Sequence, residues 1–220
     1  MTRPEGNPIY SLLKSLASKS VKAVVATIPD VTKFPYFWFY QVADLKRQTG
    51  ITKLYAVSDD RYELGFNRNK YVREISEKDI ILPSPSIETL RTSTGTKNGL
   101  GMSVDFPLPS QAILSTNDLD QFKWLNAVNS MFVSFAKESD TPVVDLHGIY
   151  ERILQGNYVS DDGVRIDPSF PNGNFFSEDG IYPSAIGQAV LANEWIKVIN
   201  AHYKTRIPLI RIQQFQAVLK

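Results

Sequence analysis

An acid and an aromatic residue, Asp179 and Tyr182, stand three positions apart in a turn-rich loop. Ser184 then provides a good helix N-cap, and apolar residues at helical spacing predict a long helix to about Asn200. An acid just ahead of a helix on a rigid scaffold is typical of a functional loop residue. The alternative is that Asp179 only shapes the turn with Gly180, and the loop taken alone favours that interpretation.

A second candidate group is the aromatic segment Phe34–Tyr40. Aromatic side chains at this density are typical of a hydrophobic core or of a cap over one. The functional alternative is that Phe37, Trp38 and Tyr40 form the wall of an apolar pocket for an acyl chain or a carbohydrate.

Other segments that look like ligand sites lack the residues those sites need. Gly95–Gly101 has neither the preceding strand nor the glycine-lysine-hydroxyl ending of a phosphate-binding loop. Gly156–Asn174 is acidic but lacks the alternating oxygen ligands of a calcium loop. Neither histidine requires a functional role to explain it. His147 is expected to be structural or solvent-facing, and a cationic His202 suits the negative end of the last helix. We therefore expect no metal ion and no cofactor.

Composition narrows the class of protein. A chain of 220 residues, 43% of them hydrophobic, can form one domain with a sizeable core. The 24 basic and 23 acidic residues nearly cancel, so no nucleic-acid partner is predicted. No stretch of about 20 apolar residues predicts a membrane span, and the polar residues after Met1 predict no secretory signal. The absence of cysteine excludes disulfides and thiolate chemistry. Localisation stays open.

The order of predicted elements is that of an α/β fold, because helices precede continuous apolar runs of the kind buried in parallel sheets. The expected helices are 7–19, Ser115–Lys137, Gly148–Leu154 and the closing helix after Ser184. The expected buried strands are Val21–Ile28 and Val143–Leu146, with short strands at Lys53–Val57 and Asp79–Leu82. Tyr62–Lys70 and Pro83–Ser110 are expected to be loops, and Ile207–Ile212 is expected to return over the core.

The segment Phe175–Asn200 resembles the last sequence block of the SGNH (GDSL) hydrolases, most closely the Bacteroidetes-type GDSL lipase/esterase-like proteins. The matching residues are Phe176, Ser177, Asp179, Gly180, Pro183, Ser184 and Gly187. The run ATIPDVTKFPYF, the strand at Val143–Leu146 and the tail Thr205–Pro208 resemble the same group.

The resemblance implies a Ser-His-Asp triad, in which Asp179 has the position of the acid and Tyr182 that of the histidine. The family's nucleophile and oxyanion blocks are missing, because the sequence contains no Gly-Asp-Ser and no Gly-x-Asn-Asp. An unperturbed phenol has a pKa near 10, so roughly one tyrosine in a thousand is ionised at pH 7. Tyr182 is therefore expected to bind or stack, not to act as a base.

The resemblance also implies a fold, a single flavodoxin-like three-layer sandwich. Residues 1–220 would form this domain without its N-terminal strands, with an irregular insert at 50–110. Only two parallel strands would be present, near 23–28 and 143–146, and two strands make a poor core. We therefore expect self-association or a partner chain that completes the sheet. Members of the family are often exported or are lipoproteins.

Three interpretations remain open from the sequence. The chain is the C-terminal portion of a GDSL-type esterase or lipase, separated from its nucleophile by truncation, gene splitting or a wrongly chosen start. Alternatively, it is a non-catalytic relative that binds an acyl or carbohydrate ligand. The third possibility is an unrelated α/β interaction domain whose resemblance is accidental.

Overall fold

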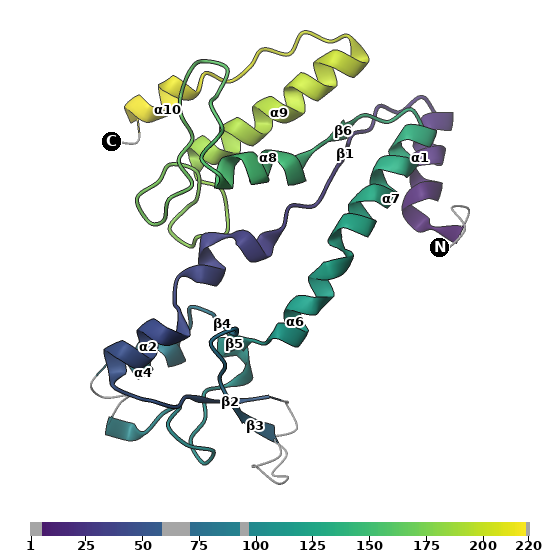
Figure 1. Ribbon diagram of the computed structural model, residues 1–220. Helices are drawn as coiled ribbons and strands as arrows, with labels where there is room; N and C mark the ends of the chain where they lie inside the picture. Colours follow the sequence, from purple (N-terminus) through teal and green to yellow (C-terminus); the bar gives the residue numbers. More distant parts are fainter. Residues whose placement is uncertain (1–5, 59–70, 93–96, 219–220) are drawn as a thin grey trace. The chain divides into compact units, whose positions relative to one another are not determined.

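The computed structural model describes residues 6–58, 71–92 and 97–218 (Figure 1). The chain divides into two compact units, one formed by Met1–Val31 with Lys123–Lys220 and the other by Thr32–Phe122. The predicted loop Tyr62–Lys70 and the start of Gly95–Gly101 lie outside the described residues. The expectation of one family domain over 1–220 with an insert at 50–110 stays a prediction.

The first unit contains a short parallel sheet. Strand β1 (Val25–Ala26) pairs in parallel with β6 (Val143–Val144), in the register Val25 to Val143 and Ala26 to Val144. The structure is thus a partial α/β fold, as the sequence predicts. The expectation that Val21–Ile28 is one strand buried on both faces is wrong. Only Val25 and Ala26 pair, and within the described part of the chain their one partner strand is β6. Val21 and Ile28, at the two ends of the segment, are exposed.

Five helices surround this sheet in the described part of the unit. They are α1 (Pro8–Ser18), α7 (Leu125–Glu138), α8 (Leu146–Leu154), α9 (Ala185–Tyr203) and α10 (Ile212–Val218). Helix α1 begins as predicted, because the Asn7 side chain accepts a hydrogen bond of 2.9 Å from the Ile9 amide. Helices α1 and α7 pack together through Tyr10 and Phe135, whose ring centroids lie 5.2 Å apart.

The predicted helix Ser115–Lys137 is helical over nearly its whole length, but it is not one regular α-helix. The structure has α6 (Thr116–Asp120), the 3-10 turn η6 (Gln121–Trp124) and then α7. Phe122 and Trp124 are exposed, so no buried apolar stripe supports a regular helix through η6. Helix α8 also begins earlier than expected, because Asp145 caps it by accepting a hydrogen bond from the Gly148 amide.

The core of the first unit holds the segment before α9 and the chain after it. Phe175 is completely buried and packs edge to face on Tyr150, with centroids 5.3 Å apart. After α9, the Asn193 side chain bonds both the amide and the carbonyl of Ile210, at 2.7 and 2.8 Å. Ile212 is fully buried. The prediction that the tail returns over the core is therefore confirmed for Ile212, whereas Ile207 and Leu209 are exposed.

The second unit is built from short elements. They are α2 (Val42–Thr49), β2 (Tyr55–Val57), β3 (Val72–Glu74), β4 (Ile80–Ile81), α4 (Pro85–Arg91) and β5 (Ile113–Leu114). Strand β2 pairs antiparallel with β3, and β4 with β5. Both predicted short strands are confirmed. The prediction that Pro83–Ser110 is all loop is wrong, because Ser84 caps α4 and Pro85 supplies its first residue.

The apolar side chains of α2, α4 and the strands form the buried core of this unit. No helix among the described residues is long and apolar enough to span a bilayer.

Candidate functional site

The loop that carries Asp179 is fixed to the start of α9. The Ser177 amide bonds the Tyr182 carbonyl at 2.8 Å, and the Ser184 amide bonds the Phe175 carbonyl at 2.8 Å. Ser184 caps the helix, because its hydroxyl accepts a bond of 3.1 Å from the Gly187 amide. The loop therefore leads into α9 on a rigid base of backbone bonds.

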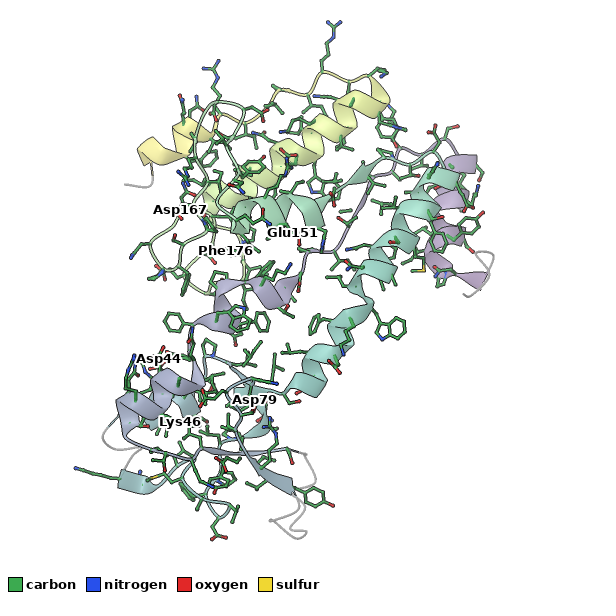
Figure 2. The ribbon with its side chains drawn as sticks, in the orientation of Figure 1. Asp44, Lys46, Asp79, Glu151, Asp167 and Phe176 are labelled. Carbon is green, nitrogen blue, oxygen red and sulfur yellow. The ribbon has the colours of Figure 1, made fainter. Side chains whose placement is uncertain are left out.

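Close packing explains why a glycine stands in the first turn of α9. A Cβ atom on Gly187 would lie 2.3 Å from the Phe175 carbonyl oxygen, which is far below any normal contact. Phe175 stacks edge to face on Phe176, which is labelled in Figure 2, with ring centroids 4.9 Å apart. The backbone before the loop and the first turn of the helix are thus in direct contact.

Asp179 binds the loop with one carboxylate oxygen. Its Oδ1 accepts bonds from the Ser177 hydroxyl at 2.7 Å, the Ile181 amide at 2.8 Å and the Tyr182 amide at 2.9 Å. Its Oδ2 makes no hydrogen bond or ion pair with a described residue. Asp179 therefore shapes the turn through one oxygen, and the residue as a whole is exposed.

The surroundings keep the Asp179 carboxyl ionised. Burial by itself would raise the pKa of this group, but the hydrogen bonds from the Ile181 amide, the Ser177 hydroxyl and the Tyr182 amide outweigh it. The net result is a pKa below the usual value for aspartate. The group thus has the negative charge that an orienting acid needs at neutral pH.

Tyr182 does not complete a catalytic pair. Its side chain is 67% exposed, and within the described residues its hydroxyl makes no hydrogen bond. The amide of the same residue lies 2.9 Å from the Asp179 carboxylate, so the side chain starts close to that oxygen. The residue next to the acid is thus an exposed tyrosine, and no imidazole stands at this position.

Neither histidine ring is paired with a hydroxyl side chain in the described part of the chain. The Nδ1 atom of His147 lies 3.3 Å from the Ile28 carbonyl, and its Nε2 atom lies 3.8 Å from Glu151. The ring of His202 packs edge to face on Tyr203 near the end of α9. Both environments agree with the structural roles expected from the sequence.

The aromatic segment of the second unit lies beside a small cavity. Phe37, Trp38 and Tyr40 contribute to its lining, and the cavity volume is about 190 Å3. Trp38 is 55% exposed, whereas Phe34 at the start of the segment is buried in the core. Part of the segment therefore lies in the core, and part of it lines the cavity.

The polar part of this lining was not predicted from the sequence. The start of α2 contributes Gln41, and the turn before β4 contributes Glu77 and Asp79. Asp79, labelled in Figure 2, is almost fully buried and binds Arg73 through both oxygens, at 2.6 and 3.1 Å. The burial of Asp79 depends on the fold, and no spacing rule along the sequence links residues 41, 77 and 79.

The described residues contain no group of three or more histidine, cysteine or acidic side chains arranged to hold a metal ion. Comparisons of the chain with protein-family models, with curated proteins and with solved structures found no match. The likeness to SGNH hydrolases therefore rests on the quoted residues alone and stays a prediction.

Proposed function

We propose that this chain is the closing, acid-bearing part of an SGNH/GDSL-type serine ester hydrolase, and that it has no esterase activity by itself. The Asp179 carboxylate carries this proposal. It is ionised, it is fixed ahead of α9, and its Oδ2 atom is free of described partners. In a serine hydrolase, an acid in this state orients the base and stabilises its protonated form.

The remaining catalytic groups are missing, which is why we propose inactivity. Position 182 holds an exposed phenol, and the rings of His147 and His202 contact other groups. The sequence has neither a Gly-Asp-Ser nor a Gly-x-Asn-Asp block. Loss of triad members lowers the rate of a serine hydrolase by on the order of 10³ to 10⁶.

A fluorophosphonate that labels activated serine hydroxyls tests this proposal. We expect mass spectrometry of the treated chain to find no modified serine at pH 7. Modification of one serine in the native chain, but not in the Asp179→Ala variant, would contradict the proposal. A serine hydrolase of known activity is the positive control.

A second candidate function is the binding of a small ligand by the aromatic segment. The cavity beside Phe37, Trp38 and Tyr40 favours it, because sites for small molecules combine apolar walls with a few polar groups. Binding requires no nucleophile, so this function is compatible with the absence of a triad.

We also propose that strand β1 recruits a further polypeptide, either a second copy or a partner chain. Within the described residues β1 pairs with β6 alone, and Val21 and Ile28 beside it are exposed. The Asn129 side chain bonds the amide and the carbonyl of Ile28, but within the described residues no second strand flanks β1, and exposed apolar side chains beside a strand edge favour strand addition. Light scattering is expected to give a mass above 24.8 kDa for the purified chain or for its complex. A stable monomer with one sharp melting transition would count against this proposal.

A further inference from the structure

We propose that the cavity beside α2 binds one neutral, hydroxylated six-membered ring, that is, a single hexose unit. The inference rests on the second candidate function, ligand binding by the aromatic segment, and is independent of the hydrolase proposal. The size of the cavity, its charge and its unpaired polar atoms each support it.

Size argues for one ring. The volume is about 190 Å3. A cavity of about 150 Å3 is enough for a benzene ring, whereas most drug-sized ligands need roughly 300 to 1,000 Å3. A long acyl chain therefore exceeds the space, and a hexose ring fits it.

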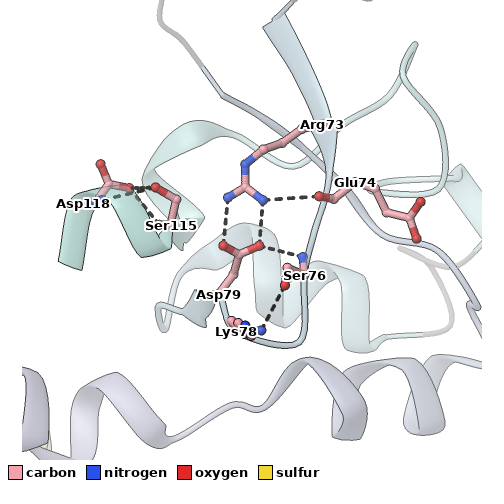
Figure 3. A network of polar contacts seen from close by, with 7 residues as sticks. All are labelled: Arg73, Glu74, Ser76, Lys78, Asp79, Ser115 and Asp118. Carbon is pink, nitrogen blue, oxygen red and sulfur yellow. Dashed lines mark hydrogen bonds and ion pairs between the residues drawn. The ribbon is translucent and has the colours of Figure 1, made fainter. Parts of the chain in front are cut away.

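Charge argues for a neutral ligand, because both carboxylates of the lining are already paired. Arg73 binds both oxygens of Asp79, and the Ser76 amide adds a bond of 2.6 Å (Figure 3). Lys46 binds one oxygen of Glu77 at 2.9 Å. Since each acid faces one cation, the cavity has no excess charge with which to attract an ion.

Hydrogen-bonding capacity argues for hydroxyl groups on the ligand. Gln41, at the N-cap of α2, does not cap the helix, and its side-chain amide bonds no described residue. The second carboxylate oxygen of Glu77 is also without a described partner. An amide can donate to and accept from a hydroxyl group, and a carboxylate accepts from one. Both groups line the cavity, so a sugar can use them and an acyl chain cannot.

The aromatic residues provide the apolar half of the site. The indole N–H of Trp38 donates to the Thr32 carbonyl at 2.7 Å, which fixes the orientation of the ring. The aromatic ring face is electron-rich, and the C–H groups on one side of a hexose carry partial positive charge. Stacking on Trp38 or Phe37 would therefore leave the sugar hydroxyls for the polar groups.

Protein NMR with the full chain tests the proposal. Neutral methyl hexopyranosides, a glucuronate and hexanoate are titrated separately against nitrogen-labelled protein. We expect the methyl glycosides to shift the Trp38 indole and Gln41 amide signals, and hexanoate and glucuronate to leave them in place. Trp38→Ala and Gln41→Ala are each expected to weaken glycoside binding about three- to tenfold.

Trp124→Ala is the matched control, because Trp124 is even more exposed, at 71%, and does not line the cavity. It is expected to leave binding unchanged, and equal weakening by Trp124→Ala and Trp38→Ala would overturn the proposed site. Shifts with hexanoate in place of the glycosides would overturn the ligand class and leave ligand binding at the aromatic segment standing. No shift with any probe would overturn both.

Discussion

Replacing Tyr182 with histidine tests whether the Asp179 carboxylate lies where it can orient an imidazole at position 182. The Tyr182 side chain is largely exposed, so the Tyr182→His variant is expected to fold. The amide at this position already lies 2.9 Å from the Asp179 carboxylate. An imidazole there is expected to come within reach of Oδ2, the oxygen without a described partner.

The expected effect is a raised pKa of the introduced imidazole. A unit charge at about 4 Å in water contributes about 1 kcal/mol, and one pKa unit corresponds to about 1.36 kcal/mol. The pKa is therefore expected to rise by about 0.7 from its ordinary value near 6.5. The high-dielectric value applies because Asp179 is exposed to solvent. The raised pKa stabilises the fold below about pH 6.5, and this contribution disappears as the pH rises through about 7.

The measurement is an NMR titration of the imidazole signals, with the native chain used to identify His147 and His202. The Tyr182→His/Asp179→Asn double variant is the matched control. The pKa is expected to return to its ordinary value in the double variant. If the pKa of the introduced imidazole differs by less than about 0.2 between the two variants, the Asp179 carboxylate is not adjacent to it, and the expected geometry is wrong.

Two further predictions concern stability. Asp179→Ala removes the acceptor of three loop hydrogen bonds and is expected to lower the free energy of unfolding in urea at pH 7 by about 1 to 2 kcal/mol. Because the folded pKa of Asp179 is lowered, the part of this difference that depends on its charge is present above the unfolded pKa near 4 and is lost as the pH falls through the folded pKa; a difference that does not decrease at all as the pH falls from 7 toward acid unfolding would contradict the explanation. Tyr203→Phe removes the hydroxyl that bonds the amide and the carbonyl of Ala23, at 3.0 and 2.6 Å, and is expected to cost about 1 to 2 kcal/mol. The control is Tyr182→Phe, because the hydroxyl of native Tyr182 has no described partner. Equal losses of unfolding free energy in the two variants would contradict the assigned role of Tyr203.

Local chemistry made much of the fold predictable. Ser184 was identified as a helix cap because its side chain can accept a hydrogen bond from the first turn, and it does so. The pairing of two short parallel strands followed from apolar runs after helices. The return of the tail was predicted from its apolar residues, although the two hydrogen bonds between the Asn193 side chain and the Ile210 backbone could not be read from the sequence.

The errors arose where burial was assumed from apolar character. Val21–Ile28 was expected to be buried on both faces, but its ends are exposed. The stripe from Ser115 onward was expected to be one helix, but Phe122 and Trp124 face solvent and the helix breaks there. Apolar spacing does not reveal whether another element covers the apolar face.

The candidate sites were predictable in unequal degree. Asp179 and the three aromatic residues were found from residue type and position. The three bonds that occupy Asp179 Oδ1, and the polar half of the cavity at Gln41 and Glu77, depend on the folded backbone. No pattern along the chain brings such distant residues together.

Hydrolysis of short-chain p-nitrophenyl esters by the purified chain is the most direct test of the central claim, which is that the acid of a hydrolase is present without its base and nucleophile. We expect the rate at pH 7 to equal that of buffer alone and the Asp179→Ala variant to show the same rate. Turnover by the native chain that disappears in the Asp179→Ala variant, while the variant stays folded, would contradict the account.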